Sequence, residues 1–416
     1  MLRLFVFAPA LFALAGCAAP GVAEAPTAAP APAAAPRPEA PEMSFEEWRA
    51  GFLARAVAAG IAPGVAQRTL AAARPVPRVL ELDAFQPEFT RPIWDYLDSA
   101  VSAARIANGR EKLAAHGAAL ARIEATYGVE REVVIAVWGL ESAYGANRGS
   151  MSVVDSLATL AWEGRRRDFA EAQLLAALRI LEAGETTQDR LVGSWAGAMG
   201  HTQFIPTSYA DYAVDYDGDG RRNIWGEAPE DALASTANYL ARFGWTRGQP
   251  WGVEARLPTG FDFALADQTA RPVSEWRALG VTAADGGPLP DHGSAGLLLP
   301  AGAGGPVFAF YGNFDVIRRY NNATSYALAI GHLADRIAGG APFRADWPRG
   351  EPPLSRSETV EMQERLTALG HDTKGADGVI GPLTRAAIRD FQRARGLAPD
   401  GYASARLLAA LRQAGG

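Results

Sequence analysis

The expected fold and chemistry both depend on one short stretch, Trp138-Gly139-Leu140-Glu141-Ser142-Ala143-Tyr144-Gly145. Glu141 follows a segment whose apolar periodicity predicts a helix buried over much of its surface. The apolar positions of that segment are Val133, Val134, Val137, Trp138 and Leu140. Water is scarce beside such a helix, and desolvation raises the pKa of a carboxyl group, as protonation of a glycosidic oxygen requires. A glutamate near a helix end is more often a solvated surface residue, so this pattern alone leaves the role open.

The first 42 residues are expected to lie outside the folded body. Residues 1–17 resemble a bacterial lipoprotein signal peptide, in which an apolar run too short to span a bilayer ends in a lipobox. Cys17, the single cysteine of the chain, is the expected lipidation site, which leaves no pair for an internal disulfide. An ordinary signal peptide with an incidental cysteine is the alternative. Because Ala18 rather than Asp follows the cysteine, the resemblance favours the periplasmic face of the outer membrane.

Composition divides the rest of the chain into a tether and two folded modules. Residues 18–42 are almost wholly Ala and Pro, which predicts an extended tether. Residues 43–340 have mainly helical periodicity, interrupted at 250–312 by Gly, Pro and Asp with short β-prone runs, which predicts a small β-rich insertion. Prolines at 341–354 indicate a linker. Residues 355–414 form a small module with two similar halves, each with an Asp-Gly pair before a helix.

Charge and composition argue against several classes of function. The formal net charge of -6 leaves no basic surplus to neutralise phosphates, so no nucleic-acid partner is expected. The five histidines show no metal-ligand spacing, and the only cysteine is assigned to the anchor. Metallopeptidase and Ser/Cys hydrolase chemistry are therefore not supported, and no cofactor is expected for catalysis.

A second motif is the acidic stretch at residues 215–223, Asp-Tyr-Asp-Gly-Asp-Gly-Arg-Arg-Asn. Its acids at positions 1, 3 and 5 and its glycine at position 6 match the front half of an EF-hand loop. The pattern departs at position 8, where Arg222 replaces the usual apolar residue, and at position 12, where Gly226 replaces the usual Glu. Hard oxygen ligands at this spacing suit calcium, which predicts a structural Ca²⁺ site; an acidic turn without metal is the alternative.

Several segments, in order, resemble the membrane-bound lytic transglycosylase B family of murein hydrolases, over about residues 45–340. The matching segments are 138–145, 155–160, 165–169, 193–206, 215–225 and 320–327. The resemblance implies a mainly α fold, with a lysozyme-like helical catalytic core and a small β-rich insertion. The segment 355–414 resembles the peptidoglycan-binding domain of wall hydrolases, which implies a small three-helix module.

The resemblance also assigns the site. It implies that Glu141 is the single catalytic acid and that seven residues contact substrate: Arg165, Arg166, Ser194, Gln203, Tyr320, Asn321 and Tyr326. Amide side chains suit the acetamido and hydroxyl groups of sugars, and tyrosine rings offer faces for sugar rings. The two arginines suit lactyl or peptide carboxylates, with a solvated helix face as the alternative.

For the acidic loop, the resemblance implies a calcium loop that is longer than an EF-hand loop. Its closing acid matches Asp231, with Glu230 as the alternative. The implied ligands are Asp215, Asp217, Asp219, the Arg221 carbonyl and Asp231.

The activity implied by the resemblance is that of a lytic murein transglycosylase. Ordinary glycosidases use two carboxylates. Here Glu141 alone would protonate the β-1,4 bond between N-acetylmuramic acid and N-acetylglucosamine, and then accept the proton of the muramic C6 hydroxyl, leaving a 1,6-anhydromuramic end. A hydrolytic muramidase and a non-catalytic peptidoglycan-binding scaffold are the alternatives. The expected partners are glycan strands and, through the lipid, a membrane; a monomer is expected, and membership of a wall-synthesis complex is left open.

Overall fold

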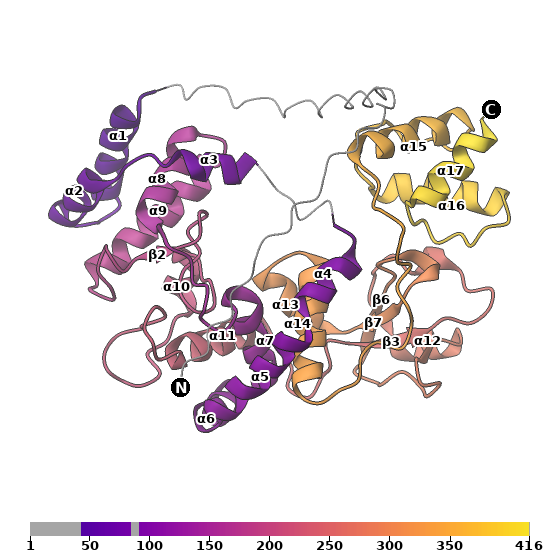
Figure 1. Ribbon diagram of the computed structural model, residues 1–416, viewed down its shortest axis with the longest axis horizontal. Helices are drawn as coiled ribbons and strands as arrows, with labels where there is room; N and C mark the ends of the chain where they lie inside the picture. Colours follow the sequence, from indigo (N-terminus) through magenta and orange to yellow (C-terminus); the bar gives the residue numbers. More distant parts are fainter. Residues whose placement is uncertain (1–42, 85–90, 416) are drawn as a thin grey trace, which may run out of the picture. The chain divides into compact units, whose positions relative to one another are not determined.

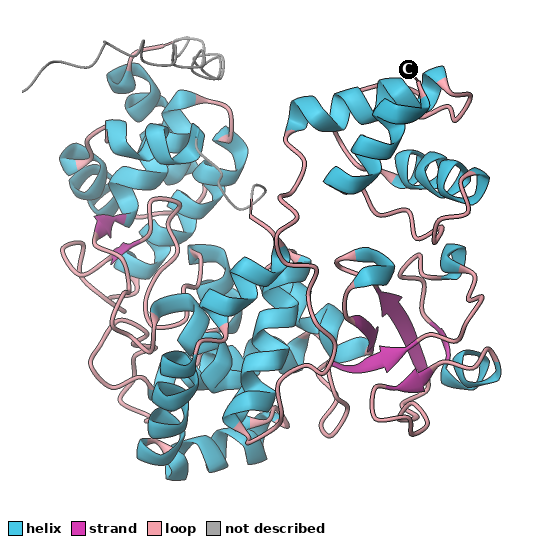
Figure 2. Cartoon of the chain, turned by 45° about the vertical axis from the view of Figure 1, so that its right-hand side comes forward, coloured by secondary structure: helices cyan, strands magenta, loops and turns pink. Residues whose placement is uncertain are grey.

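The computed structural model of the chain describes residues 43–84 and 91–415. The expected signal peptide, Cys17 and the tether at 18–42 lie outside the described residues. Helices predominate in the described part, with one five-stranded sheet and one two-stranded sheet, so the expectation of a mainly α fold is confirmed (Figures 1 and 2).

One group of helices packs around α8 and α9 (Figure 1). It consists of α1 (Phe45–Ala58), α2 (Pro63–Ala72), α3 (Pro77–Ala84), α8 (Val153–Glu163), α9 (Arg167–Glu182) and α10 (Pro206–Tyr212). The chain enters α1 through a capping box, in which the Ser44 hydroxyl accepts from the Glu47 N–H and the Glu47 carboxylate accepts from the Ser44 N–H. The two-stranded sheet joins β1 (Met151–Ser152) to β2 (Val192–Gly193) next to this group.

A second group surrounds α7 (Arg131–Ser142), the helix that carries Glu141. Its other members are α4 (Ile93–Ala100), α5 (Ala103–Ala115), α6 (Gly117–Tyr127), α11 (Glu230–Arg242), α13 (Gly312–Tyr320) and α14 (Thr324–Ile337). Residues 133–139 of α7 are all buried, against α5, α6, α11 and α14. Both helix groups share one hydrophobic core, so α7 is held firmly along its length.

The predicted β-rich insertion is present as an antiparallel sheet in the order β4-β6-β7-β3-β5. Its strands are β3 (Gly252–Arg256), β4 (Arg271–Pro272), β5 (Thr282–Ala283), β6 (Ser294–Leu298) and β7 (Val307–Phe310). Helix α12 (Val273–Ala278) is fixed to the sheet because Trp276 donates from Nε1 to the Ala295 carbonyl at 2.7 Å. Two short 3₁₀ helices, Phe263–Leu265 and Gly302–Gly304, complete the insertion, which has its own core.

The segment 341–354 packs on the catalytic part of the chain. The Phe343 ring stacks on His332 with centroids 3.7 Å apart, and Trp347 lies 6.2 Å from Trp94. Arg349 then forms an ion pair with Asp98 at 2.6 Å. Pro342 and Pro348 therefore belong to a packed strap, which we define as residues 341–350, whereas Pro352 and Pro353 follow it and are exposed.

The C-terminal module consists of three helices, α15 (Arg356–Ala368), α16 (Pro382–Ala394) and α17 (Ala405–Ala414), as expected (Figures 1 and 2). They enclose a separate core built from Met362, Leu366, Ala387, Ile388, Phe391, Leu407, Leu408 and Leu411.

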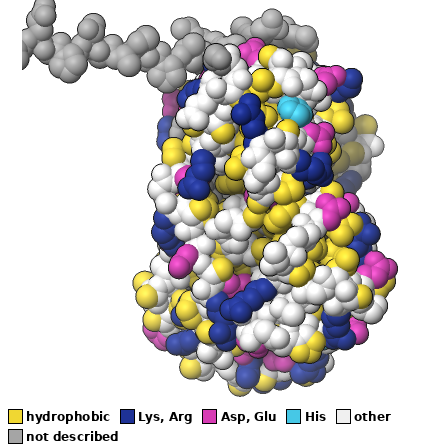
Figure 3. Space-filling model, turned by 90° about the vertical axis from the view of Figure 1, so that its right-hand side faces the viewer, with side chains coloured by type: hydrophobic (Ala, Val, Ile, Leu, Met, Phe, Trp, Pro, Cys, Tyr) yellow, Lys and Arg dark blue, Asp and Glu magenta, His cyan; other side chains and the backbone are white. Residues whose placement is uncertain are grey.

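Basic and acidic side chains are interspersed on the face of the molecule drawn in Figure 3, with no extended area of one sign. Among the described residues, no helix is long and apolar enough to cross a membrane.

Candidate active site

Helix α7 ends in a strained turn that fixes the direction of Glu141. Ala143 and Tyr144 have φ angles of 50° and 60°, a left-handed region that non-glycine residues seldom adopt. The turn is held because the Tyr144 hydroxyl donates to the Arg105 carbonyl at 2.7 Å. The tyrosine ring lies flat against Gly139, where a Cβ atom would sit 2.6 Å from it. The glycine two residues before Glu141 is therefore required by the packing of this turn.

Glu141 is a partly buried carboxyl group in the last turn of α7. Burial raises the pKa of Glu141 to about 7, against the opposing effect of the hydrogen bond from Tyr326, whose hydroxyl donates to Oε1 at 2.5 Å. A helix C-terminus also disfavours negative charge. At neutral pH the group is therefore divided between its acid and its base form, as a residue that both gives and takes a proton requires.

Two tyrosines lie near this carboxyl group, one of them in direct contact with it. Tyr326, in the first turn of α14, contacts Glu141 directly. Tyr320, at the end of α13, donates from its hydroxyl to the Thr202 carbonyl at 2.6 Å. Burial, reinforced by the nearby Glu141 charge, raises the pKa of both tyrosines well above its usual range, so both stay neutral donors. Asn321 follows Tyr320 and is exposed, with Oδ1 accepting from the Ala323 N–H at 3.1 Å.

The loop 193–204 lies opposite these tyrosines and is tightly wound. The Ser194 hydroxyl accepts from the Ala196 and Ala198 N–H groups at 3.3 and 3.0 Å. Gln203 has a φ of 54° and donates from Nε2 to the Arg148 and Gly200 carbonyls at 3.2 and 2.9 Å. Hydrogen bonds between side chains and the backbone thus fix the shape of the loop. They hold the strained Gln203 next to Thr202, whose carbonyl accepts from the Tyr320 hydroxyl.

His201 links the end of α7 to this loop, a role that the sequence did not reveal. Its carbonyl accepts from the Ser142 hydroxyl at 2.5 Å, and its Nδ1 accepts from the Trp138 Nε1 at 3.1 Å. Its Nε2 lies 2.8 Å from the Gly226 carbonyl, which fixes the tautomer with the proton on Nε2. Burial lowers the pKa of His201, so the ring is neutral. A lone histidine without ligand spacing gave no sequence signal for this function.

Arg165 and Arg166 are engaged elsewhere in this structure. Both guanidinium groups pair with the buried carboxylate of Asp83 on α3, Arg166 at 3.4 Å. Arg166 also lies over the Phe169 ring, 4.8 Å from its centroid. Within the described residues, neither arginine shares a hydrogen bond with Glu141, Tyr320 or Gln203. Their contact with substrate stays a prediction, and about half of the Arg165 side chain is exposed to make it.

The acidic loop brings three carboxylates together. Oxygens of Asp215, Asp217 and Asp219 all lie within 4.8 Å of one another. Asp231 is not one of these three carboxylates. Its Oδ1 and Oδ2 accept from the Tyr216 and Asn223 N–H groups at 2.8 and 2.7 Å. Burial, then the charges of Asp217 and Asp215, raises the pKa of Asp231.

The alternative closing acid, Glu230, contacts His116 instead, with its Oε1 2.9 Å from the His116 Nδ1. A hard cation among the three oxygens would relieve their mutual repulsion, and the donor set fits calcium.

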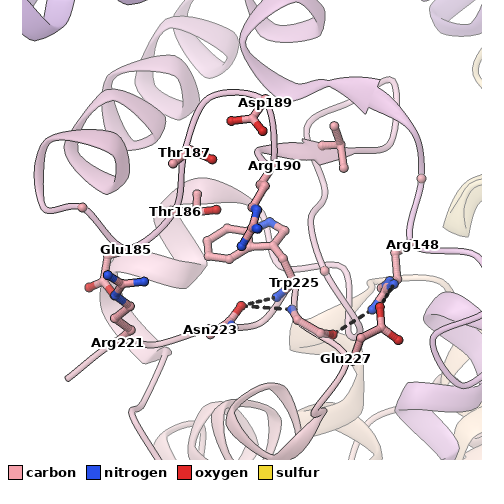
Figure 4. Close-up of a pocket in the computed structure, with 15 residues that line it drawn as sticks. Arg148, Glu185, Thr186, Thr187, Asp189, Arg190, Arg221, Asn223, Trp225 and Glu227 are labelled. Carbon is pink, nitrogen blue, oxygen red and sulfur yellow. Dashed lines mark hydrogen bonds and ion pairs between the residues drawn. The ribbon is translucent and has the colours of Figure 1, made fainter. Parts of the chain in front are cut away.

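A charged cavity of about 620 Å³ adjoins the loop 193–204 (Figure 4). Arg148 lines it and pairs with Glu227 at 3.2 Å, while the Arg148 backbone carbonyl holds Gln203. Arg190 and Arg221 also line it, together with the carboxylates of Glu185 and Asp189. The cavity thus shares Gly200 with the loop 193–204, whose His201 carbonyl contacts Ser142 next to Glu141.

Comparisons with known proteins agree with this geometry. The family described as Transglycosylase SLT domain matches residues 44–335, and the peptidoglycan binding domain family matches residues 355–411. The membrane-bound lytic murein transglycosylase B of Escherichia coli (strain K12) is 37% identical over 227 residues, which span 53% of this chain and 60% of that relative. The chain therefore covers less than two thirds of the length of that relative.

Solved structures match over more of the chain. SltB3 from Pseudomonas aeruginosa, in complex with NAG-anhNAM-pentapeptide, is 51% identical, with a TM-score of 0.84 over 89% of this chain and 100% of that one. The Escherichia coli lytic transglycosylase Slt35, in complex with calcium, is 31% identical, with a TM-score of 0.61 over 70% and 92%. These matches confirm the lysozyme-like helical fold that the sequence predicted. The chain belongs to the transglycosylase SLT family of lytic transglycosylases, enzymes that act on peptidoglycan, and it carries a C-terminal peptidoglycan-binding domain.

Proposed function

We propose that this chain cleaves the β-1,4 bond between N-acetylmuramic acid and N-acetylglucosamine and leaves a 1,6-anhydromuramic end. The observation that carries the proposal is the pKa of about 7 at Glu141, whose carboxyl group is hydrogen-bonded to a neutral tyrosine. The ligand in the SltB3 structure contains an anhydromuramic unit, which supports the same outcome here.

In the first step, protonated Glu141 gives its proton to the glycosidic oxygen. The bond between that oxygen and muramic C1 breaks, and the leaving N-acetylglucosamine departs as an alcohol. The substrate's own acetamido group stabilises the cationic C1. The Tyr326 hydroxyl, 2.5 Å from Oε1, steadies the carboxylate that results.

In the second step, the Glu141 carboxylate accepts the proton of the muramic C6 hydroxyl, whose oxygen bonds to C1. The proton returns to Glu141, and no water is consumed. One carboxyl group serves twice because its pKa is close to the working pH, so neither protonation state is costly. No cofactor takes part in this chemistry.

Substrate contacts are proposed for the residues around this centre. Gln203 and Asn321 would bind sugar amides and hydroxyls, and Ser194 lies on the same loop as Gln203. Tyr320 and Tyr326 present neutral hydroxyls beside Glu141. Arg165 and Arg166 would meet lactyl or peptide carboxylates while retaining Asp83 as their structural partner.

We further propose that the acidic loop binds a structural calcium ion. Asp215, Asp217 and Asp219 would supply carboxylate oxygens. The Arg221 carbonyl, two residues after Asp219, would be a further ligand, as the family resemblance implies. Asp231 would act by holding the loop backbone, as its two hydrogen bonds to Tyr216 and Asn223 indicate. The calcium complex of Slt35 supports this assignment.

Attachment to a membrane is proposed through a lipid on Cys17. The lipobox and the membrane-bound relative from Escherichia coli support this placement. The C-terminal module would then hold the enzyme on the wall while the tether reaches from the outer membrane. Replacing Cys17 with Ser should release the protein from membranes in a fractionation experiment.

Mass spectrometry of products released from purified sacculi tests the proposed activity. Muropeptides about 18 Da lighter than hydrated ones, the mass of one water, are expected from intramolecular closure. Hydrated reducing ends would instead establish a muramidase. No release by the wild-type chain would favour a binding scaffold, and Glu141→Gln is the matched inactive control.

A further inference from the structure

The C-terminal module contains one structural device twice. In the first copy, Gln363 donates from Nε2 to the aspartate of the turn Asp377-Gly378 at 2.9 Å and accepts from the glycine N–H at 2.8 Å. In the second, Gln392 makes the same two bonds to the turn Asp400-Gly401, at 2.7 and 2.9 Å. We call these the first turn and the second turn.

The correspondence extends to the preceding helices. A Cβ atom on Gly378 would lie 3.2 Å from the Arg356 carbonyl, and one on Gly401 would lie 3.1 Å from the Arg385 carbonyl. Both glycines are left-handed, with φ angles of 74° and 72°. In each copy the arginine precedes the glutamine by seven residues. The two turns are therefore built and supported in the same way.

The second turn is occupied by the chain's own backbone. Oδ2 of Asp400 accepts from the Ala303 N–H at 2.7 Å. Tyr402, two residues after that aspartate, packs on Gly302, where a Cβ atom would lie 2.7 Å from the Tyr402 Cβ. The occupant is thus a peptide N–H flanked by small residues, Ala301, Gly302 and Ala303. Larger side chains there would prevent this approach.

The first turn presents the same acceptor with apolar neighbours exposed. Oδ1 of Asp377 is taken by Gln363 and by the Val379 N–H at 2.8 Å, as Oδ1 of Asp400 is in the second turn. Val379 and Leu383 are 60% and 58% exposed, unusual values for large apolar side chains. They stand where the second turn has Tyr402 and Arg406. Together with the Asp377 carboxylate, these two side chains offer a ligand apolar contact beside a hydrogen-bond acceptor.

We propose that the first turn is a binding site for the peptide stems of peptidoglycan. Asp377 would accept a backbone N–H next to a small residue such as alanine, and Val379 and Leu383 would contact the small side chain. The second turn supplies the precedent, because its occupant at Ala303 has this chemistry. The inference rests on the proposed action of the chain on peptidoglycan, and it assigns a separate site on the module.

The test uses Asp377→Asn in the full chain, in a Glu141→Gln background so that the sacculi stay intact. Asparagine keeps Oδ1 for Gln363 and Val379 but replaces Oδ2 with an N–H₂ donor, which opposes the ligand's N–H. Sedimentation with sacculi should weaken by about tenfold, the usual effect of losing one charged hydrogen bond. Asp400→Asn is the matched control, since it makes the same change at the turn that Ala303 already fills, and its sedimentation should equal that of the parent.

A second arm uses sacculi from which an amidase has removed the stem peptides. On this bare glycan, Asp377→Asn and its parent should sediment equally. A tenfold difference on bare glycan would show that sugars are bound and would overturn the proposal. So would parental sedimentation of Asp377→Asn on intact sacculi, or an equal loss in Asp400→Asn.

Two further measurements keep the result interpretable. Leu383→Lys is a second test of the site, for use if Asp377→Asn does not fold, because position 383 is exposed. This variant should also weaken sedimentation with sacculi, and parental sedimentation would overturn the proposal. Release of anhydromuropeptides by the chain with Glu141 intact is measured separately, so failure of the proposed activity is distinguished from failure of this site.

Discussion

Two opposing effects set the pKa of Glu141. Burial at the end of α7 raises this pKa, and the hydrogen bond from Tyr326 lowers it. The sequence predicted the first, because an apolar helix led directly to the carboxyl group. The family resemblance predicted Tyr326 as a substrate contact, but its hydrogen bond to Glu141 was not predicted, since a contact between residues 185 positions apart has no local pattern. The left-handed Ala143 and Tyr144 and the His201 linkage were not predicted, because tertiary packing alone imposes them.

The raised pKa of Glu141 should make the free energy of unfolding depend on pH. Below the unfolded value of 4.5 the carboxyl is protonated in both states and costs nothing. As pH rises from 4.5 to about 7, the native state keeps a proton that the unfolded state loses, so the native state becomes relatively less stable. Glu141→Gln removes this penalty and should stabilise the fold by about 3 kcal/mol at pH 8, but hardly at pH 4. Thermal unfolding at both pH values measures it; an equal effect at both would contradict the assignment.

Tyr326→Phe tests the opposing contact. The hydrogen bond from the tyrosine favours the carboxylate, so its loss should raise the pKa of Glu141 further. The alkaline side of the pH profile for anhydromuropeptide release should then move to higher pH, while the maximal rate falls. Tyr239→Phe is the control, because its hydroxyl donates to the Arg319 carbonyl at 2.6 Å and does not touch Glu141. Equal profiles for both variants would remove Tyr326 from this role.

At the scale of elements, the end of α7 shows how packing overrides propensity. Gly139→Ala should favour the helix by about 1 kcal/mol, but the added methyl group meets the Tyr144 ring at 2.6 Å. The Tyr144 hydroxyl is also confined by Gly109, where a Cβ atom would lie 2.6 Å from it, so overpacking of about 1–3 kcal/mol outweighs the gain. A lower melting temperature and loss of cleavage are expected. Gly117→Ala, at the start of α6 where nothing lies within 4 Å, should keep full cleavage and a melting temperature no lower than that of the parent. A stabilised and active Gly139→Ala would contradict the packing argument.

The acidic loop is the second element with a testable role. Its residue types were predictable from spacing, but the hydrogen bonds that take up both Asp231 oxygens were not. Asp217→Asn keeps Oδ1 for the Asp219 N–H at 3.1 Å while removing one charge from the cluster. Calcium should therefore raise its melting temperature less than that of the parent, and in chelator the variant should be at least as stable as the parent.

Asp285→Asn is the matched control for the loop. Its Oδ1 also accepts from an N–H two residues later, that of Gly287 at 2.9 Å, but within the described part of the chain it belongs to no acidic cluster. Calcium should stabilise this variant as much as the parent. An equal loss of stability for Asp217→Asn with calcium and with chelator would count against a metal site.

At the scale of the whole molecule, composition predicted where the modules lie along the chain, but it did not predict the contacts between them. Helical periodicity, the β-prone runs and the repeated Asp-Gly pairs correspond to three separate cores. The prolines of 341–354 indicated a linker, yet the strap packs through Trp347 on Trp94 and through Arg349 on Asp98. Such contacts join residues far apart in sequence, so no local sequence pattern predicts them.

Because the module has its own core, removal of residues 351–416 should spare catalysis. The strap stays in place through Arg349, and the single hydrogen bond from Ala303 to the Asp400 carboxylate contributes about 1.5–3 kcal/mol. Turnover of soluble muropeptides should equal that of the full chain, whereas sedimentation with sacculi should fall steeply. A shorter chain that ends at residue 340 is the control, and it should melt earlier because the strap is gone. If the 351–416 deletion loses turnover of soluble substrate, the module supports the catalytic fold itself. If sedimentation is unchanged, wall binding belongs to the part of the chain that carries Glu141.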